Sequence, residues 1–361
     1  MRRAAVGALA VTTACSLLTS FEGFDEPRPR SEAGADAGGD GAPPDPCFHK
    51  RWPAPPASGP DGDVGELYAA VRAMSMASAE GDPPYGFDLD NLCSCPDRLA
   101  CLGPQPGKPC DPADSGTDNA ANDLFNFFSS RSGIKLDESG LRLGLDTGRF
   151  GLMFRLVGWN GEGNDPDVQL TAFNAFAVNG GSDAGARFDG TDVWTLDVAS
   201  FVDARIPAFP ATSAYVADGV LVATFTRLVV KVRIPTSGGR WLLIPVEMRD
   251  VHVAARVQRA GSGFSLSNAE MGGRMPTSSL LSLAVSGGAC PGSTGFEAVK
   301  PLLCDSRDVP LDPGKDGRDA PCEALSMGMV FDAVAARPAA EAGVPVEFVP
   351  CPDAGPVEDC R

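Results

Sequence analysis

Histidine is scarce in this chain of 361 residues, which contains only His49 and His252. Zinc enzymes that bind their metal mainly through imidazole are therefore excluded by count, apart from mixed carboxylate sites. Long apolar runs are also missing, since no stretch reaches the roughly 18 apolar residues of a membrane-spanning helix. No run of Lys or Arg exceeds two residues, and the formal net charge is −17. Such a chain would repel a polyanion, so nucleic acid is not expected as a partner.

The first fourteen residues have the pattern of an export signal. Arg2 and Arg3 give a positive start, and residues 4–14 are weakly apolar. Residues 12–15, Thr-Thr-Ala-Cys, resemble the lipobox of bacterial lipoproteins, in which small residues precede a cysteine that carries the lipid. This resemblance implies a lipid on Cys15 and a place in a Gram-negative envelope. Ser16, rather than aspartate, follows the cysteine, which implies sorting to the outer membrane, facing the periplasm or the cell surface.

The whole chain resembles uncharacterised lipoproteins of high-GC Gram-negative bacteria through "CSLL" after the leader, "GFDLDNLCSC" and "NGEGNDPDV". That resemblance implies no particular activity. Residues 27–46 contain no Val, Ile, Leu, Met, Phe, Trp or Tyr, and nine of these twenty residues are Gly or Pro. Such a segment cannot bury enough apolar surface to offset the entropy of ordering. We expect residues 1–14 to be the leader and residues 15–46 a flexible tether.

Cysteines are missing from residues 111–289, and this gap divides the chain. Apart from Cys15, five cysteines precede the gap and five follow it, namely Cys47, Cys93, Cys95, Cys101, Cys110, Cys290, Cys304, Cys322, Cys351 and Cys360. Cysteines of exported proteins usually form disulfides, although four thiolates before the gap could alternatively bind zinc. Because five is odd, complete pairing within the chain requires at least one disulfide between the two groups. The two ends of the globular part should then be neighbours.

The pattern of apolar residues changes along the chain. An Asp63-x-x-Glu66 capping box, with apolar residues following at helical spacing, predicts a helix that ends at Gly81 and the prolines after it, and a second helix is expected over residues 119–130. The middle of the chain predicts strands joined by short turns. The strand candidates are residues 141–143, 151–157, 168–178, 215–217, 220–225, 228–234, 241–246, 251–257, 264–266, 327–333 and 344–349.

These patterns predict a mainly β fold, an antiparallel sandwich or barrel. The expected parts of the globular region are a small, disulfide-rich helical segment at residues 47–132, the β domain at residues 133–289, and a disulfide-stapled cap of loops and strands at residues 290–361 that packs on the β domain. No internal repeat suggests a solenoid or a propeller.

The sequence offers few catalytic motifs. Asp146-Thr147-Gly148 has the form of the aspartic protease turn, but the second such tripeptide, at residues 114–116, does not follow a strand, so a hairpin turn is the better interpretation. His252 alternates with valines, as expected of a histidine that is satisfied within a strand. Trp159, Trp194 and Trp241 could form a platform for sugars, although burial in the core is twice as common. No catalytic residue is therefore predicted.

Acidic loops are the better candidates for a site. Asp88 and Asp90 precede Cys93, and Asp111, Asp114 and Asp118 follow Cys110, so a disulfide here could bring two oxygen-rich loops together. Calcium prefers six to eight oxygen ligands, which such loops can provide, although solvated turns are the simpler explanation. We therefore expect no required cofactor, with calcium possible at these loops.

The functional expectation follows from the leader and the acidic loops. We expect an envelope-anchored lipoprotein that acts as a non-catalytic binding or structural surface module. Its partners would be the membrane, through the lipid, and a glycan or an envelope protein. The first alternative is a calcium-dependent, lectin-like carbohydrate-binding domain. The second is a glycan hydrolase with two carboxylates flanking the scissile bond.

Overall fold

A computed structural model describes residues 48–79, 82–94, 101–102, 111–112, 114–132, 136–181, 185–203, 206–235, 241–317, 319–346, 350–351 and 360. All of them belong to one compact unit, residues 45–361. The predicted leader and tether, including the lipid site Cys15, lie outside the described residues. Cys47, Cys95 and Cys110 lie outside them too.

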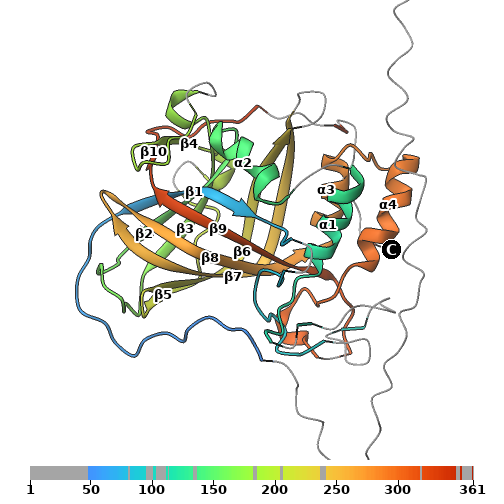
Figure 1. Cartoon of the computed structure of the whole chain (residues 1–361), viewed down its shortest axis with the longest axis horizontal. Coiled ribbons are helices and arrows are strands. Elements are labelled where there is room, and N and C mark those ends of the chain that lie inside the picture. Colours follow the sequence, from blue (N-terminus) through green and yellow to red (C-terminus); the bar gives the residue numbers. More distant parts are fainter. Residues whose placement is uncertain are drawn as a thin grey trace, which may run out of the picture. The chain divides into compact units, whose positions relative to one another are not determined.

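The fold is mainly β and is built around one sheet of ten strands (Figure 1). The strands lie in the order β10-β4-β3-β2-β1-β9-β8-β7-β6-β5. They are β1 (Leu67–Ser75), β2 (Gly151–Val157), β3 (Gln169–Phe176), β4 (Val193–Leu196), β5 (Ser213–Ala217), β6 (Val220–Pro235), β7 (Trp241–Ala260), β8 (Gly263–Pro276), β9 (Ala324–Ala335) and β10 (Arg337–Pro338). Neighbouring strands pair antiparallel except β10 and β4, which are parallel, so the sheet is mixed rather than purely antiparallel.

Backbone hydrogen bonds also link strands that are not neighbours in this order. The Val168 N–H donates to the Ala214 carbonyl at 3.0 Å, and the Ala211 N–H donates to the Leu170 carbonyl at 2.8 Å. These bonds join the region of β5 to that of β3, so the sheet closes on itself. Phe154 of β2 and Phe331 of β9 stack in the core with ring centroids 5.4 Å apart. Closure therefore gives the strands a shared hydrophobic core.

The hairpin predicted at Asp218-Gly219 is confirmed, because these two residues connect β5 to β6. Their φ angles are +49° and +76°, the left-handed values that a tight two-residue hairpin turn requires. The segments predicted as separate strands at residues 241–246 and 251–257 are parts of one strand, β7. Of the two late strand candidates, residues 327–333 lie in β9, whereas residues 344–346 lie in no strand.

The prediction of a helix between the Asp63 capping box and Gly81 was wrong. Residues Leu67–Ser75 form β1, which lies between β2 and β9 and is mostly buried, with Arg72 exposed. The Asp63 carboxylate accepts a bond from the Gly65 N–H at 2.7 Å, a local turn rather than a helix cap. A short apolar run is compatible with the spacing of a helix or of a strand. Here the segment forms a strand because it pairs with β2 on one side and β9 on the other.

The strand predicted at residues 141–143 was also wrong, because they lie in α2 (Glu138–Asp146). Asp137 caps this helix by accepting a bond from the Gly140 N–H at 2.9 Å. Asp146-Thr147-Gly148 therefore ends a helix and is not a hairpin turn. The helix expected over residues 119–130 is present as α1 (Ala120–Ser132), with an N-terminal bond from the Asn122 N–H to the Asn119 side chain.

Two further helices, α3 (Thr277–Ser286) and α4 (Thr294–Asp305), lie where the sequence predicted only loops and strands. They gather with α1 on one side of the sheet, whereas α2 lies apart from them (Figure 1). Buried Leu280, Leu281 and Phe296 extend the core between these helices and the sheet. Among the described residues, no helix combines the length and hydropathy that a bilayer crossing requires.

Three disulfides join described cysteines: Cys101–Cys322, Cys290–Cys351 and Cys304–Cys360. The first spans 221 residues and connects the cysteine group before the gap to the group after it. The bond predicted from the odd cysteine count is thus confirmed. Cys93 and Cys101 are both disulfide-bonded, so a zinc site with both as thiolate ligands is contradicted.

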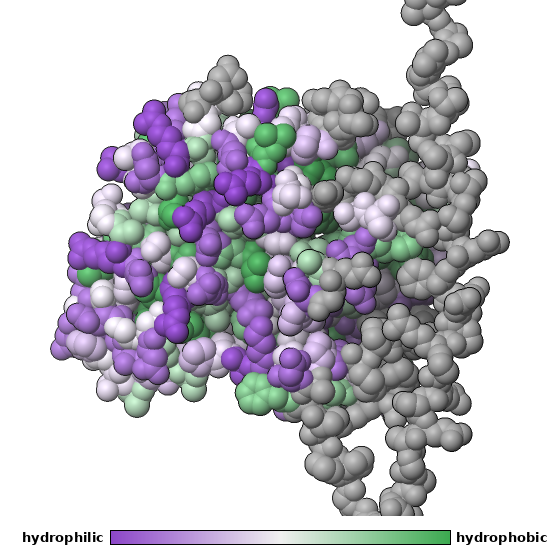
Figure 2. Space-filling view, viewed as in Figure 1, coloured by the Kyte–Doolittle hydropathy of each residue, from purple (hydrophilic) through white to green (hydrophobic). Residues whose placement is uncertain are grey.

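Hydrophilic side chains are spread over the face of the molecule shown in Figure 2, with hydrophobic side chains scattered between them. In this view most of the strands lie on the left, and α1, α3 and α4 lie on the right. The distribution agrees with a chain of large negative charge that keeps its apolar residues in the closed sheet.

Candidate functional site

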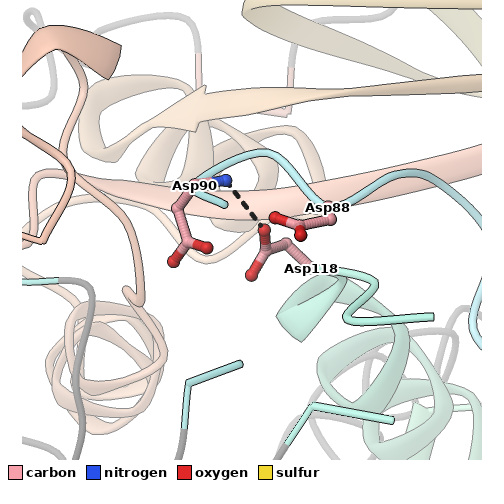
Figure 3. A group of neighbouring side chains, drawn as sticks. All are labelled: Asp88, Asp90 and Asp118. Carbon is pink, nitrogen blue, oxygen red and sulfur yellow. Dashed lines mark hydrogen bonds between the residues drawn. The ribbon is translucent and has the colours of Figure 1, made fainter. Parts of the chain in front are cut away.

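Three of the predicted calcium ligands come together in the structure. Asp88, Asp90 and Asp118 each offer a carboxylate oxygen within 4.8 Å of the other two, and all three residues are buried (Figure 3). Asp88 and Asp90 come from the loop before Cys93, and Asp118 comes from the segment that leads into α1. The Asp118 N–H donates to the Phe87 carbonyl at 3.0 Å, which holds the two segments side by side. We call these three residues the carboxylate cluster.

A glycine in β9 allows the first of these segments to approach the sheet. A side chain at Gly328 would collide with the Tyr85 carbonyl, so only glycine permits this close contact. The loop is therefore held between β9 and the segment before α1, and Asp88 and Asp90 are placed by backbone packing.

The other two predicted ligands lie apart from the cluster. Asp111 accepts a bond from the Ser94 N–H at 2.7 Å, and Asp114 is exposed. Conversely, the sequence did not point to His49, which pairs with Asp88, or to Arg51, whose guanidinium lies 4.0 Å from the same carboxylate. These pairs span more than thirty residues, so no local pattern could have revealed them.

Each carboxylate of the cluster organises nearby backbone. Asp118 Oδ2 accepts bonds from the N–H groups of Leu89 at 2.6 Å and of Asp90 at 3.2 Å. Asp90 Oδ1 accepts from the Leu92 N–H at 2.8 Å, and Asp88 Oδ1 accepts from the Asn91 N–H at 2.7 Å. The three carboxylates thus satisfy N–H groups of the turn that carries Asp88 and Asp90.

Burial of several carboxyl groups in one place affects their ionisation. Desolvation, followed by the charges of neighbouring aspartates, raises the pKa of Asp90 to about 7. Desolvation and the Asp90 charge raise the pKa of Asp118 well above its usual value. At neutral pH the cluster therefore retains a proton unless a cation neutralises it. Both a pair of acids that share a proton and a cation-binding site behave in this way.

Arg274 of β8 lies beside this region and is fully buried. Its guanidinium forms two bonds with Asp316, at 2.7 and 2.6 Å, and donates to the carbonyls of Leu89 and Pro310, both at 2.9 Å. Burial acts to lower the pKa of Arg274, but the bonds to Asp316 outweigh it and the pKa is raised. The charged arginine joins β8, the loop of the carboxylate cluster and the segment before β9.

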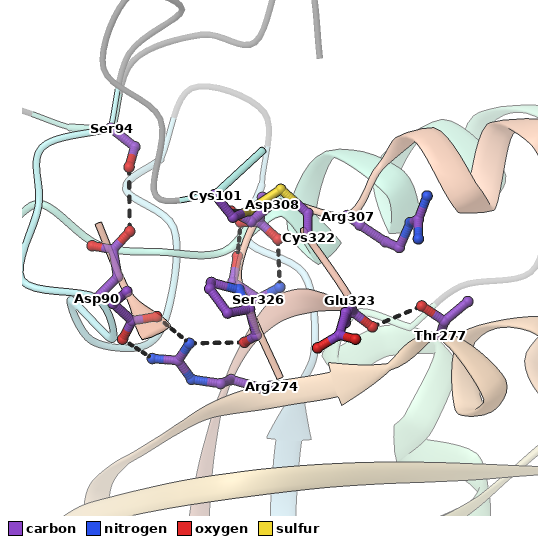
Figure 4. Close-up of a disulfide and its surroundings, with 12 residues drawn as sticks. Asp90, Ser94, Cys101, Arg274, Thr277, Arg307, Asp308, Cys322, Glu323 and Ser326 are labelled. Atoms are coloured by element: carbon purple, nitrogen blue, oxygen red, sulfur yellow. Dashed lines mark hydrogen bonds and ion pairs between the residues drawn. A yellow bond between two sulfur atoms is a disulfide. The ribbon is translucent and has the colours of Figure 1, made fainter. Parts of the chain in front are cut away.

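The disulfide Cys101–Cys322 lies close to Arg274, as Figure 4 shows. Between them, Ser326 of β9 donates to Asp308 through both its hydroxyl and its N–H, and its oxygen accepts from the Ala120 N–H at 2.9 Å. Ser326 thereby satisfies a donor at the start of α1. A disulfide and hydrogen bonds therefore connect the segments before β2 to those from β8 onward in this region.

Both histidines hold the opening segment, residues 48–53, against the rest of the structure. His49 pairs with Asp88, and the ring of His252 stacks on Trp52 with centroids 3.9 Å apart. His252 also lies 3.3 Å from Asp250, so it is a satisfied strand histidine, as predicted. Trp159 and Trp194 are buried in the core, which contradicts an exposed sugar platform at these two positions.

The carboxylate cluster makes stability depend on pH. Aspartate in an unfolded chain has a pKa near 4, whereas Asp90 and Asp118 have raised values when folded. Between about pH 4 and 7 these two groups bind more protons in the folded protein than in the unfolded chain, so their contribution to stability falls as pH rises. We expect Asp118→Asn, which keeps an acceptor without the charge, to raise the free energy of unfolding at pH 7.5 and to change it little at pH 4.

Urea unfolding at both pH values, in the presence of a chelator, measures this difference. The exposed Asp146→Asn is the matched control and should leave the pH dependence unchanged. Parallel pH profiles for the wild type and Asp118→Asn would contradict the expectation.

No protein family model matches this chain, and neither the curated proteins nor the solved structures give a significant match. Its function is therefore inferred from its own residues.

Proposed function

We propose that this protein is an exported, non-catalytic binding module that a lipid on Cys15 anchors to the outer membrane. The disulfide Cys101–Cys322 is the observation that carries this proposal. Disulfides persist in oxidising compartments such as the bacterial periplasm and the cell surface, and they are rare in the cytosol. A covalent bond between the two ends of the globular part suits a domain that must remain folded outside the cytosol.

The arrangement of the acidic and imidazole side chains supports binding over catalysis. A general acid or base must reach the substrate. Asp88 and Asp118 are instead buried and bond to backbone or to His49, and His252 is covered by Trp52. The closed sheet, a barrel rather than a sandwich in this proposal, supplies the rigid scaffold on which loops bind a glycan or an envelope protein.

Lipid attachment is tested by expressing the full-length gene in a Gram-negative host with an alkyne-tagged fatty acid. We expect the wild type to incorporate the label and to fractionate with outer membranes. Cys15→Ala should lose the label and become soluble in the periplasm, whereas Ser16→Ala, the adjacent control, should keep the label. An unlabelled wild type, or a labelled Cys15→Ala, would refute the lipid anchor.

Calcium-dependent carbohydrate binding is the second candidate, and the carboxylate cluster favours it. Each of the three residues offers one carboxylate oxygen, and these oxygens lie within 4.8 Å of one another, as oxygen ligands of calcium would. Burial and, to a smaller extent, repulsion between the aspartates raise the pKa of Asp90 and Asp118, and a bound divalent cation would offset both effects by stabilising the ionised carboxylates.

Thermal unfolding at pH 7.5 tests this second candidate. A calcium concentration 100-fold above Kd stabilises a protein by about 2.7 kcal/mol, so we expect the Tm to rise by about 5 °C or more relative to chelator. Asp118→Asn should abolish the rise, whereas Asp146→Asn should retain it. An identical Tm with calcium and with chelator would rule out calcium at this cluster.

A further inference from the structure

A hollow of about 590 Å³ lies where β1, β8 and β9 meet α1 and the start of α2. Its size falls within the range of small-molecule sites, about 300–1,000 Å³. Strand residues such as Ala73, Ala269 and Phe331 form part of its wall, and Tyr85 and Asn126 add an aromatic ring and an amide. The hollow is separate from the carboxylate cluster, none of whose residues line it.

The strands are irregular where they form this wall. The pairing of β1 with β9 shifts register between Val71 and Ala73, and that of β8 with β9 shifts between Leu266 and Ala269. Such irregularities bend strands and redirect side chains, and they are common beside binding sites. The hollow thus lies where both neighbours of β9 depart from regular pairing.

The charged residues that line the hollow are all acidic. Its described residues include five carboxylates and no Lys or Arg, the acids being Asp82, Asp137, Glu138, Glu270 and Asp332. Neutral hydrogen-bonding side chains stand among them, namely Ser75, Ser78, Tyr85, Asn126, Ser139 and Asn268. A ligand that complements this wall carries positive charge and several hydroxyl groups.

Three of the acids already attract cations from outside the wall, and one of these pairs is Arg142 with Glu138, at 3.5 Å. Lys50 Nζ lies 2.6 Å from Glu270, and Arg72 lies 3.6 Å from Asp332. Both bonds that Glu270 accepts from described residues, from Lys50 and from the Gly86 N–H, use Oε1. Asp332 Oδ1 accepts from the Asn268 N–H at 3.1 Å. A carboxylate has about four acceptor sites, so each can accept a further N–H donor.

We infer that this hollow binds a small hydroxylated amine of the amino-sugar class. Its ammonium group would lie between Glu270 and Asp332, and its hydroxyls would meet the serine and asparagine side chains of the wall. This inference rests on the proposed binding function and names the chemistry of its ligand. It does not depend on the lipid at Cys15, so the two can fail separately.

Calorimetric titration of the full-length protein with glucosamine, and with the trimer of glucosamine as the glycan form, tests the inference. N-acetylglucosamine lacks the positive charge, and spermidine lacks the hydroxyls, so these two are the ligand controls. We expect glucosamine or its trimer to bind, and the N-acetylated sugar to bind at least about tenfold more weakly. Stronger binding of the trimer would indicate a glycan as the source of the amine.

Glu270→Gln and Asp332→Asn should each weaken glucosamine binding by about tenfold. Glu247→Gln is the matched control, because Glu247 is also ion-paired, to Arg227 and Arg249, yet does not line the hollow. The inference is overturned if glucosamine and its trimer fail to bind at millimolar concentration. It is also overturned if spermidine binds best, or if Glu247→Gln weakens binding as much as Glu270→Gln.

Discussion

Replacing Arg274 with methionine is expected to lower the free energy of unfolding by about 3–5 kcal/mol. The substitution keeps much of the apolar stem but removes a buried guanidinium and its bonds to Asp316, Leu89 and Pro310. Asp316 and the nearby Asp250 then lose their buried cationic partner, and the two carbonyls lose their donors. Desolvated groups without partners, rather than the lost attraction itself, account for most of this cost.

Urea unfolding at pH 7 measures the change. Arg249→Met, on the exposed side of the neighbouring strand β7, is the matched control and should cost less than about 1 kcal/mol. Adding Asp316→Asn to Arg274→Met should recover part of the loss, because it removes the unpaired carboxylate. A cost below 1 kcal/mol for Arg274→Met would show that this arginine does not hold the two ends of the chain together.

Removing the disulfide between the two ends, in the double variant Cys101→Ala and Cys322→Ala, is expected to cost about 4–5 kcal/mol. The bond closes a loop of 221 residues, whereas Cys290–Cys351 and Cys304–Cys360 close loops of 61 and 56 residues. The entropy that a disulfide removes from the unfolded chain rises with the logarithm of the length of the loop that it closes. Cys101–Cys322 should therefore contribute about 1 kcal/mol more to stability than either of the other two disulfides.

Each disulfide is tested by its own double alanine variant under non-reducing conditions, with equilibrium unfolding in urea as the measurement. The two short bonds serve as controls, since all three variants lose two sulfur atoms and one covalent link. Equal losses for the three variants, or a larger loss for a short bond, would contradict the entropic explanation.

Local patterns predicted the regular parts of this fold well. The Asp218-Gly219 hairpin, β2, β3, β9 and α1 all follow from short-range turn, strand and capping preferences. The failures at β1 and α2 have a common cause. Both segments carry apolar residues at spacings compatible with a helix or a strand. In each case the tertiary contacts of the segment determine which of the two forms.

The candidate site shows the same division. Acidic composition before Cys93 and after Cys110 pointed to Asp88, Asp90 and Asp118, and the structure brings these three carboxylates together. Composition did not distinguish them from the exposed Asp114, and it gave no sign of His49 or Arg274. Arg274 lies between glycines and methionines in β8, and only its bonds to the loop and to Asp316 reveal its role.

The sequence by itself determined that the protein is mainly β and that complete pairing of the cysteines after Cys15 requires a disulfide between the two cysteine groups, because turn chemistry and an odd count require no knowledge of packing. Only the tertiary structure decided that the sheet closes on itself, which carboxylates are buried together, and where an acidic hollow opens beside irregular strands. Those features depend on contacts between residues tens to hundreds of positions apart, such as Lys50 with Glu270, and no local pattern records such contacts.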